Sequence, residues 1–161
     1  MPEPRPAPAF TLRPVTAEDY SFLYDLHVAA MKEYVAQTWG WDEAVQQAMF
    51  RENFTPERSQ IVMVDGRAVG VFAAERRPAE WFVWAIAIGP EMQGQGLGAT
   101  LLRDLLATAA RDALPTRLQV LRVNLARRLY ERLGFAVVGE TPTHYLMLAP
   151  AHTLQQQCEE G

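Results

Sequence analysis

The stretch Glu91–Thr100 reads EMQGQGLGAT and places three glycines within five residues. It follows an apolar run typical of a strand, Trp81–Ile88, and precedes a run typical of a helix, Leu101–Ala110. Glycines allow backbone N–H groups to converge on one point, and the first turn of a helix adds unpaired donors and a positive dipole end. We therefore expect an anion of phosphate size where the strand meets the helix, and the alternative is a tight turn without a ligand.

Two common phosphate-binding motifs fit this stretch less well. A nucleoside-triphosphate loop needs Gly-Lys-Ser or Gly-Lys-Thr at the helix start, and Gly98 is not followed by lysine. Gly94, Gly96 and Ala99 do match the G-x-G-x-x-A variant of the dinucleotide fingerprint. The next strand ends at Asn124 without the acidic residue that would hold a ribose, which makes an oxidoreductase the weaker alternative.

Composition restricts the class of protein. The chain has 161 residues, 49% of them apolar, which is enough for one core. Its 19 acidic and 15 basic residues give a net charge of -4, so we expect no nucleic-acid partner, although Arg127 and Arg128 form a local basic spot. No run approaches the roughly 20 apolar residues of a membrane span, and the start MPEPRPAPAF lacks a secretory pattern. We expect a cytoplasmic protein without a membrane partner.

Both ends of the chain differ from its middle. Residues 1–9 contain four prolines and are predicted to be disordered, and residues 150–161 are predicted to form a polar tail. A single domain is expected over residues 10–149. Cys158 lies in the tail, so neither a disulfide nor a metal site is expected.

The interior alternates strand and helix patterns, which predicts an α+β fold. Glu80–Ile88 is apolar at nearly every position, as in a central strand covered on both faces. The other predicted elements are a strand Phe10–Arg13, helices from Thr16 to about Lys32 and over Asp42–Asn53, a hairpin turning at Asp65–Gly66, a helix 96–112, a strand 117–123, a helix 125–133 ending at a left-handed Gly134, and strands 135–140 and 143–149.

Two motifs resemble those of the GNAT superfamily, the acetyl-CoA-dependent N-acetyltransferases. Gln93–Gly98 is similar to the family's Q/R-x-x-G-x-G/A motif, and Val123–Phe135 (VNLARRLYERLGF) is similar to its second hallmark, an asparagine followed by a helix with a tyrosine and a final Gly-Phe. The resemblance covers Phe10 to about Leu148. It implies a mixed central sheet of about six to seven strands, whose parallel fourth and fifth strands splay apart, flanked by about four helices.

In this family the cofactor is acetyl-CoA, which enters the gap between the splayed strands. Its pantetheine arm would pair with the fourth strand and its pyrophosphate would lie on the glycine-rich turn. The residues expected to bind it are Ile86, Ala87, Ile88, Gln93, Gly94, Gln95, Gly96, Leu97, Gly98, Ala99, Asn124 and Tyr130. Asn124 lies only six residues before Tyr130, a departure from the family's pattern.

The reaction requires two proton transfers. An amine is mostly ammonium at neutral pH and must lose a proton, and the departing thiolate must gain one. Tyr130 matches the family tyrosine, and the ordinary pKa of a phenol, near 10, leaves it able to donate. A tyrosine on an amphipathic helix is otherwise typical of a core. A backbone N–H near Ile88 would polarise the thioester carbonyl.

The base has several candidates. Glu80 lies at the start of the fourth strand on the same face as Phe82 and Trp84, and family members often recruit a carboxylate there, directly or through water. A glutamate beside a turn is also typical of a solvated hairpin. Glu75 on the preceding strand is a similar candidate. His144 and Tyr145 on the last hairpin are candidates to face the amine, or surface residues.

The segment MKEYVAQTWGWDE is expected to line the acceptor pocket, because the corresponding region does so in the family. Its candidate residues are Glu33, Tyr34, Trp39 and Trp41, and Trp84 joins them from the fourth strand. Aromatic faces attract an ammonium group. Two tryptophans that flank a glycine are equally typical of a packing corner.

The sequence therefore predicts an N-acetyltransferase that moves an acetyl group from acetyl-CoA directly to a primary amine of a small molecule or peptide. The alternative is a non-catalytic sensor that retains the acyl-CoA cleft. We expect a monomer or a homodimer.

Overall fold

The computed structural model describes residues 7–151. The predictions for residues 1–6 and 152–161, including that for Cys158, lie outside the described residues. The strands are β1 (Thr11–Pro14), β2 (Ser59–Val64), β3 (Arg67–Arg76), β4 (Trp81–Ile88), β5 (Thr116–Leu121), β6 (Ala136–Glu140) and β7 (His144–Ala149), and the helices are α1 (Tyr20–Thr38), α2 (Glu43–Asn53), α3 (Leu97–Arg111) and α4 (Arg127–Arg132).

The strands form one mixed sheet in the order β1-β2-β3-β4-β5-β7-β6. β4 and β5 are parallel neighbours, while β5 and β7 pair antiparallel. Seven strands and four α-helices thus lie within the described residues, in the order that the sequence predicts. The predicted α+β fold class is confirmed.

The described chain forms two compact units, which are considered separately. The first contains the described residues up to Ala73 together with Ala85–Gly98, and the second contains Ala74–Trp84 and the described residues from Ala99 onward. β3, β4 and α3 contribute residues to both units. The single domain over residues 10–149 stays a prediction.

The first unit contains the predicted β-hairpin. Asp65 and Gly66 have φ angles of 51° and 77°. Both lie in the left-handed region that a two-residue type I′ loop requires. Val64 pairs with Arg67 across this turn, so the hairpin turns where the sequence predicts it.

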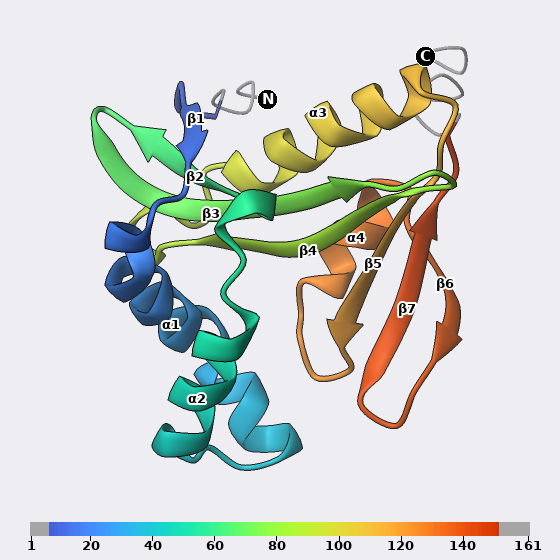
Figure 1. The fold of residues 1–161 in the computed structure, drawn as a ribbon. Coiled ribbons are helices and arrows are strands. Elements are labelled where there is room, and N and C mark those ends of the chain that lie inside the picture. Colours follow the sequence, from blue (N-terminus) through green and yellow to red (C-terminus); the bar gives the residue numbers. More distant parts are fainter. Residues whose placement is uncertain (1–6, 152–161) are drawn as a thin grey trace, which may run out of the picture. The chain divides into compact units, whose positions relative to one another are not determined.

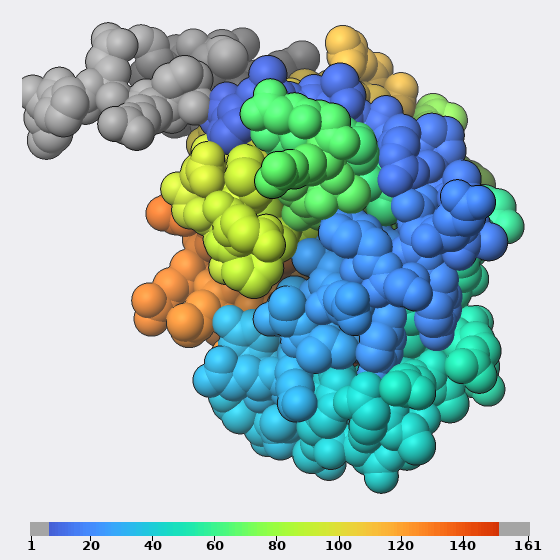
Figure 2. Space-filling model, turned by 90° about the vertical axis from the view of Figure 1, so that its left-hand side faces the viewer, coloured from blue at the N-terminus to red at the C-terminus, as the bar shows by residue number. Residues whose placement is uncertain are grey.

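The helices of the first unit pack through aromatic and aliphatic side chains. Val15, Leu23 and Ile61 form a buried cluster, against which Phe22, Phe50, Phe54, Met63, Ala68 and Val71 pack. α2 is capped by Asp42, whose side chain accepts a hydrogen bond from Val45 N at 3.0 Å. No residue of α2 is buried. In Figure 2 α1 (blue) and α2 (cyan to teal) accordingly form adjoining parts of the surface.

An ion pair ties β1 to the start of α1. Arg13 donates to both carboxylate oxygens of Asp19, at 2.8 and 2.9 Å, and Thr16 N donates to Asp19 at 2.9 Å. The guanidinium of Arg13, followed by the backbone N–H of Thr16, lowers the pKa of Asp19 to about 2, against the opposing effect of burial. Because the ionised form is the one that is stabilised, this contribution to stability is present above about pH 4 and is lost as the pH falls toward 2.

Asp19→Asn is therefore expected to lower the free energy of unfolding by about 1–2 kcal/mol at pH 7, a value reduced because Arg13 is partly exposed. Urea denaturation at pH 7 and at pH 2.5 measures this, and the difference between variant and wild type should shrink at the lower pH. Asp25→Asn, on the exposed side of α1, is the control. An equal loss of stability at both pH values would contradict the ion-pair explanation.

The second unit has its own core. α3 contributes Leu101, Leu102, Leu105, Leu106 and Ala109, which recur with helical spacing and are all buried. β7 lies between β5 and β6, as Figure 1 shows, and its Met147 and Ala149 are fully buried.

Some predicted boundaries and one burial prediction are wrong. α1 continues to Thr38 rather than ending near Lys32, because the apolar spacing extends to the buried Val35. β5 ends at Leu121 rather than at residue 123, because the Leu121 carbonyl accepts a hydrogen bond from Asn124 N and the chain turns there. β4 is not covered on both faces along its length, since Trp84 is 44% exposed.

No helix among the described residues is long and apolar enough to cross a membrane.

Candidate active site

The glycine-rich turn lies in the first unit, between the end of β4 and the start of α3. Gly94 and Gly96 have φ angles of 79° and 87°, in the region that disfavours residues with a Cβ. The turn leads directly into α3 at Leu97. The first N–H groups of a helix have no acceptor within that helix, so the turn and the helix start together present backbone donors. This is the local geometry that the sequence predicts.

Neighbouring side chains do not crowd the two glycines of the turn. A Cβ built on Gly94 would meet nothing within 4 Å, and one on Gly96 would meet only Ala7 Cβ, at 3.6 Å. A ligand-free tight turn would have neighbouring side chains packed closely against these glycines. No such packing is found at Gly94, and only Ala7 comes near Gly96. A need for backbone conformation and for access to the amides explains the glycines better.

The end of β4 is held by close backbone packing within the first unit. A Cβ on Gly70 would lie 2.6 Å from the carbonyl oxygen of Ala87, so β3 and β4 approach as only glycine permits. Gln93 Nε2 donates to the carbonyl oxygen of Ile88 at 2.9 Å and links the strand to the turn. These contacts fix the backbone of Ile86–Ile88, the segment expected to pair with pantetheine.

The parallel pairing of β4 with β5 is short. It joins Trp81 to Thr116, Phe82 to Arg117 and Val83 to Leu118. All three pairs lie within the second unit, while β4 continues into the first unit and ends at Ile88. The predicted parallel pairing of the fourth and fifth strands is confirmed, and their splay stays a prediction.

Tyr130 lies on α4 in the second unit, with a buried side chain that is 8% exposed. Its ring meets the ring of Phe135 edge-to-face, with centroids 6.0 Å apart. Burial raises the pKa of the phenol to about 12. The hydroxyl forms no hydrogen bond with the described residues.

Asn124 has a structural contact in the second unit. Its Oδ1 accepts a hydrogen bond from Ala126 N at 2.9 Å, which closes the turn into α4. The side-chain oxygen is therefore occupied by the backbone, while the amide NH₂ has no partner among the described residues. A contact from Asn124 to the cofactor stays a prediction.

Both candidate bases belong to one charged cluster of the second unit. Glu80 accepts from Arg117 Nε at 3.1 and 3.2 Å, and Glu75 accepts from Trp84 Nε1 at 2.9 Å. The Phe82 and Trp84 rings lie 4.7 Å apart, as expected for neighbours on one face of β4. The structure thus brings Glu75, Glu80 and Trp84 together, with both carboxylates already in hydrogen bonds.

The last hairpin places His144 and Tyr145 in different surroundings. Thr143 Oγ1 lies 2.8 Å from His144 Nδ1, and burial lowers the pKa of His144, which favours the neutral imidazole. The Tyr145 ring is contacted by the guanidinium carbons of Arg127 at 4.4 Å and Arg122 at 5.2 Å. A cationic acceptor at Tyr145 would compete with these arginines, and an amine contact of His144 stays a prediction.

The predicted acceptor segment separates in the structure. Trp39 is 60% exposed, Glu33 is exposed, and the Tyr34 carbonyl accepts from Thr38 Oγ1. Trp41 instead packs toward His27, with ring centroids 6.2 Å apart, and Lys32 Nζ lies 5.6 Å from its ring centre. Trp41 is the residue of this group that enters a cluster between α1 and α2.

That cluster contains residues that the sequence reasoning missed. Glu43 accepts hydrogen bonds from Tyr24 OH at 2.7 Å and from Trp41 Nε1 at 2.9 Å. His27 lies 5.3 Å from Phe50 between the ring centroids, and burial lowers its pKa. The spacing of Tyr24 and His27 marks one face of α1, and this signal was present in the sequence. Their partners on α2 depend on how the two helices pack, which spacing does not reveal.

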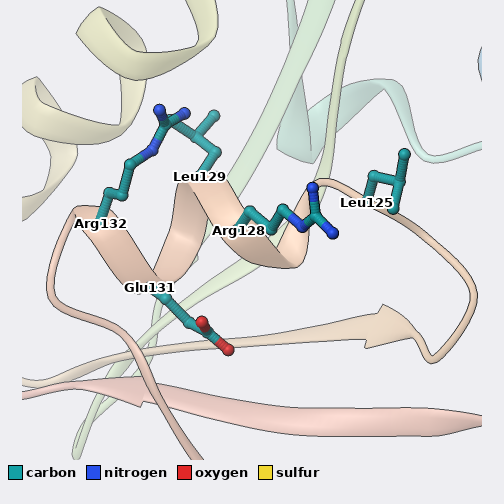
Figure 3. A pocket seen from close by; sticks show the side chains of 5 residues that line it. All are labelled: Leu125, Arg128, Leu129, Glu131 and Arg132. Atoms are coloured by element: carbon teal, nitrogen blue, oxygen red, sulfur yellow. The ribbon is translucent and has the colours of Figure 1, made fainter.

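A pocket of about 650 Å³ lies along α4, lined by Leu125, Arg128, Leu129, Glu131 and Arg132. In Figure 3, Leu129 and Arg132 project to one side of the helix and Glu131 to the other. None of the predicted site residues lines this pocket. Its charged side chains do not converge on one point, so we assign it no function.

Comparison with known proteins settles the family. A sequence profile of the acetyltransferase (GNAT) family matches residues 20–135, more than half of the chain. The chain therefore belongs to the acetyltransferase (GNAT) family. This result decides against the oxidoreductase alternative that the glycine spacing had left open.

A stretch of 58 residues is 38% identical to L-2,4-diaminobutyric acid acetyltransferase of Nocardia farcinica. The match covers 34% of this chain and 30% of that enzyme, so it spans about a third of this chain and less than a third of the enzyme. The likeness of this chain to that enzyme is therefore a likeness over 58 residues.

Solved structures share the fold over most of the chain. PaiA N-acetyltransferase from Thermoplasma acidophilum, in complex with coenzyme A, superposes with a TM-score of 0.72 at 18% identity, covering 88% of this chain and 99% of that one. An acetyltransferase from Thermus thermophilus gives 0.71 at 22% identity, covering 91% and 99%. Ribosomal-protein-S18-alanine N-acetyltransferase from Escherichia coli gives 0.65 at 22% identity, covering 89% and 94%.

Proposed function

We propose that this protein is an N-acetyltransferase that transfers the acetyl group of acetyl-CoA to a primary amine of a small molecule or peptide. The observation that carries the proposal is the turn at Gly94 and Gly96, which has positive φ angles and open space and leads into α3. Membership of the acetyltransferase (GNAT) family and the likeness to a protein solved with coenzyme A support the same donor.

The chain's own backbone would hold the donor. The amides of Gln93–Ala99 would bind the pyrophosphate, and the backbone of Ile86–Ile88 would pair with the pantetheine arm, with further contacts from Asn124 and Tyr130. Acetyl-CoA supplies a thioester whose carbonyl carbon accepts the amine. An N–H near Ile88 would polarise that carbonyl, and the close packing of β3 against β4 at Gly70 supports a fixed backbone there.

Tyr130 is proposed as the general acid. Its pKa of about 12 keeps the phenol protonated throughout the neutral range, and its hydroxyl has no partner among the described residues that would compete for the proton. Glu80 is proposed to accept the proton of the ammonium group, directly or through a water, with Glu75 in the same cluster as the second candidate. Glu80 would accept this proton while it also accepts a hydrogen bond from Arg117, and Glu75 while it accepts one from Trp84.

The acceptor would be bound by side chains from both helices and strands, for which we propose Glu33, Tyr34, Trp39, Trp41, Trp84, His144 and Tyr145. The relative from Nocardia farcinica acts, by its name, on a small diamino acid, and this favours small aliphatic amines over peptides as the first compounds to test.

The proposal predicts acetyl transfer in a direct assay. Purified protein, acetyl-CoA and a panel of amines that includes L-2,4-diaminobutyrate, simple diamines and peptide N-termini are mixed, and release of free thiol is followed. At least one amine should give thiol release well above that of acetyl-CoA alone, and mass spectrometry should find the acetylated amine. Calorimetric binding of coenzyme A without turnover on any amine would instead indicate the sensor alternative.

A further inference from the structure

The guanidinium group of Arg77, in the turn between β3 and β4, lies against two aromatic rings and two carboxylates. Its central carbon is 4.4 Å from the ring centre of Phe82 and 5.3 Å from that of Trp84. Its Nε lies 3.5 Å from Glu75 and its Nη1 lies 3.8 Å from Glu80. Ring faces and carboxylates are both negative, so these four side chains surround a position suited to a cation.

Each of these four side chains has contacts that do not involve Arg77. Glu80 is held by Arg117 at 3.1 Å, and Glu75 by the indole N–H of Trp84 at 2.9 Å. The rings of Phe82 and Trp84 pack on each other at 4.7 Å. These contacts would hold the two carboxylates and the two rings in place if the Arg77 side chain moved away.

Arg77 itself is weakly attached through its side chain. Its contacts of 3.5 and 3.8 Å to the carboxylates are longer than the 3.1 Å contact of Arg117, and about a third of its side chain is exposed. Exposed ion pairs and cation–π contacts contribute little each. The turn is closed by a backbone bond, Arg77 N to the Glu80 carbonyl at 2.8 Å, which does not need the side chain. The side chain can leave without opening the hairpin.

We propose that Glu75, Glu80, Phe82 and Trp84 form a cation seat for the ammonium group of the acceptor, and that Arg77 fills this seat until an acceptor displaces it. The inference rests on the proposed function, in which Glu80 and Trp84 already face the amine. It deepens that function by defining the acceptor as a small cation, an alkylammonium or guanidinium compound. Arg77 is then an internal competitor that sets the apparent affinity.

The test measures binding of methylguanidinium and methylammonium ions by NMR, through the indole N–H signal of Trp84, which a Trp84→Phe variant assigns. Arg77→Met retains an unbranched side chain and removes the charge. If Arg77 fills the seat in about nine of ten molecules, this variant should bind the probe about tenfold more tightly than wild type. Arg103→Met, an exposed arginine of α3, should behave as wild type.

Two further measurements complete the test. Adding Glu80→Gln to Arg77→Met should weaken probe binding again, and in wild type the probe should perturb the Arg77 Nε–H signal, which needs no variant to fold. Equal probe affinity in wild type and Arg77→Met, or no saturable shift in either, would overturn the seat.

Turnover is measured separately, so the two proposals can fail independently. If the probe binds as expected while no amine is acetylated, the proposed function fails and the seat stands. If an amine is acetylated but its KM is the same in Arg77→Met as in wild type, the seat falls and the proposed function stands.

Discussion

Tyr130→Phe is expected to lower turnover by about 10²- to 10⁴-fold, the range typical for the loss of a positioned general acid. The ring and its edge-to-face contact with Phe135 would be kept, because only the hydroxyl is removed. That hydroxyl forms no hydrogen bond with the described residues, so the variant should fold with unchanged stability. The affinity for acetyl-CoA, measured by calorimetry, should stay within about threefold of wild type, so that the loss appears in kcat.

The pH profile gives an additional check on Tyr130. Because burial raises its pKa to about 12, ionisation of the phenol would not reduce activity below about pH 11. Any limb of the wild-type profile between pH 6 and 9 should therefore persist in the residual activity of Tyr130→Phe. Tyr20→Phe, which changes a tyrosine of the α1–α2 cluster, is the matched control and should leave turnover unchanged. A wild-type rate in Tyr130→Phe would remove this residue from the mechanism.

The order of the elements and the hairpin were predictable because their signals are local. An Asp-Gly pair between β-branched runs suits only a few backbone conformations, and Asp65 and Gly66 adopt one of them. The glycine spacing at residues 94–98 likewise reports a backbone requirement that neighbours in sequence impose. The positive φ angles of Gly94 and Gly96 express this requirement in the structure.

Burial along β4 was not predictable in the same way. An apolar run indicates what a strand prefers to cover, but the elements that pack on the strand decide what is covered. Trp84 lies within the apolar run of β4 and is 44% exposed. An apolar sequence thus does not guarantee burial, and exposed apolar positions of this kind are where patterning is expected to fail.

The charges around Glu80 could not be read from the sequence either. Its closest partner, Arg117, is 37 residues away and becomes a neighbour only through the parallel pairing of β4 with β5. Arg77 is close in sequence, but an arginine in a turn ordinarily extends into solvent. Its position over Phe82 and Trp84 depends on side-chain packing, which residue spacing does not predict.

The double variant Gly94→Ala/Gly96→Ala is expected to weaken binding of coenzyme A by about 30- to 1000-fold. A residue with a Cβ costs about 1–2 kcal/mol in the left-handed region, and two such residues cost about 2–4 kcal/mol if the penalties add. An alanine Cβ meets nothing within 4 Å at position 94 and only Ala7 at position 96, so steric crowding does not explain the loss. The variant chain would relax to negative φ angles, and binding would have to restore the original turn.

Gly40→Ala is the matched control for this prediction. Gly40 has a φ angle of 84° and also has nothing within 4 Å of a Cβ, but it lies at the joint of α1 and α2. It should lose stability, by about 1–2 kcal/mol, and keep its affinity for coenzyme A. For both variants, calorimetry measures the affinity for coenzyme A and urea denaturation measures the free energy of unfolding. The comparison shows whether backbone strain weakens coenzyme A binding wherever it lies or only at residues 94 and 96. Unchanged coenzyme A affinity in the double variant would mean that the amides of residues 93–99 do not bind the pyrophosphate.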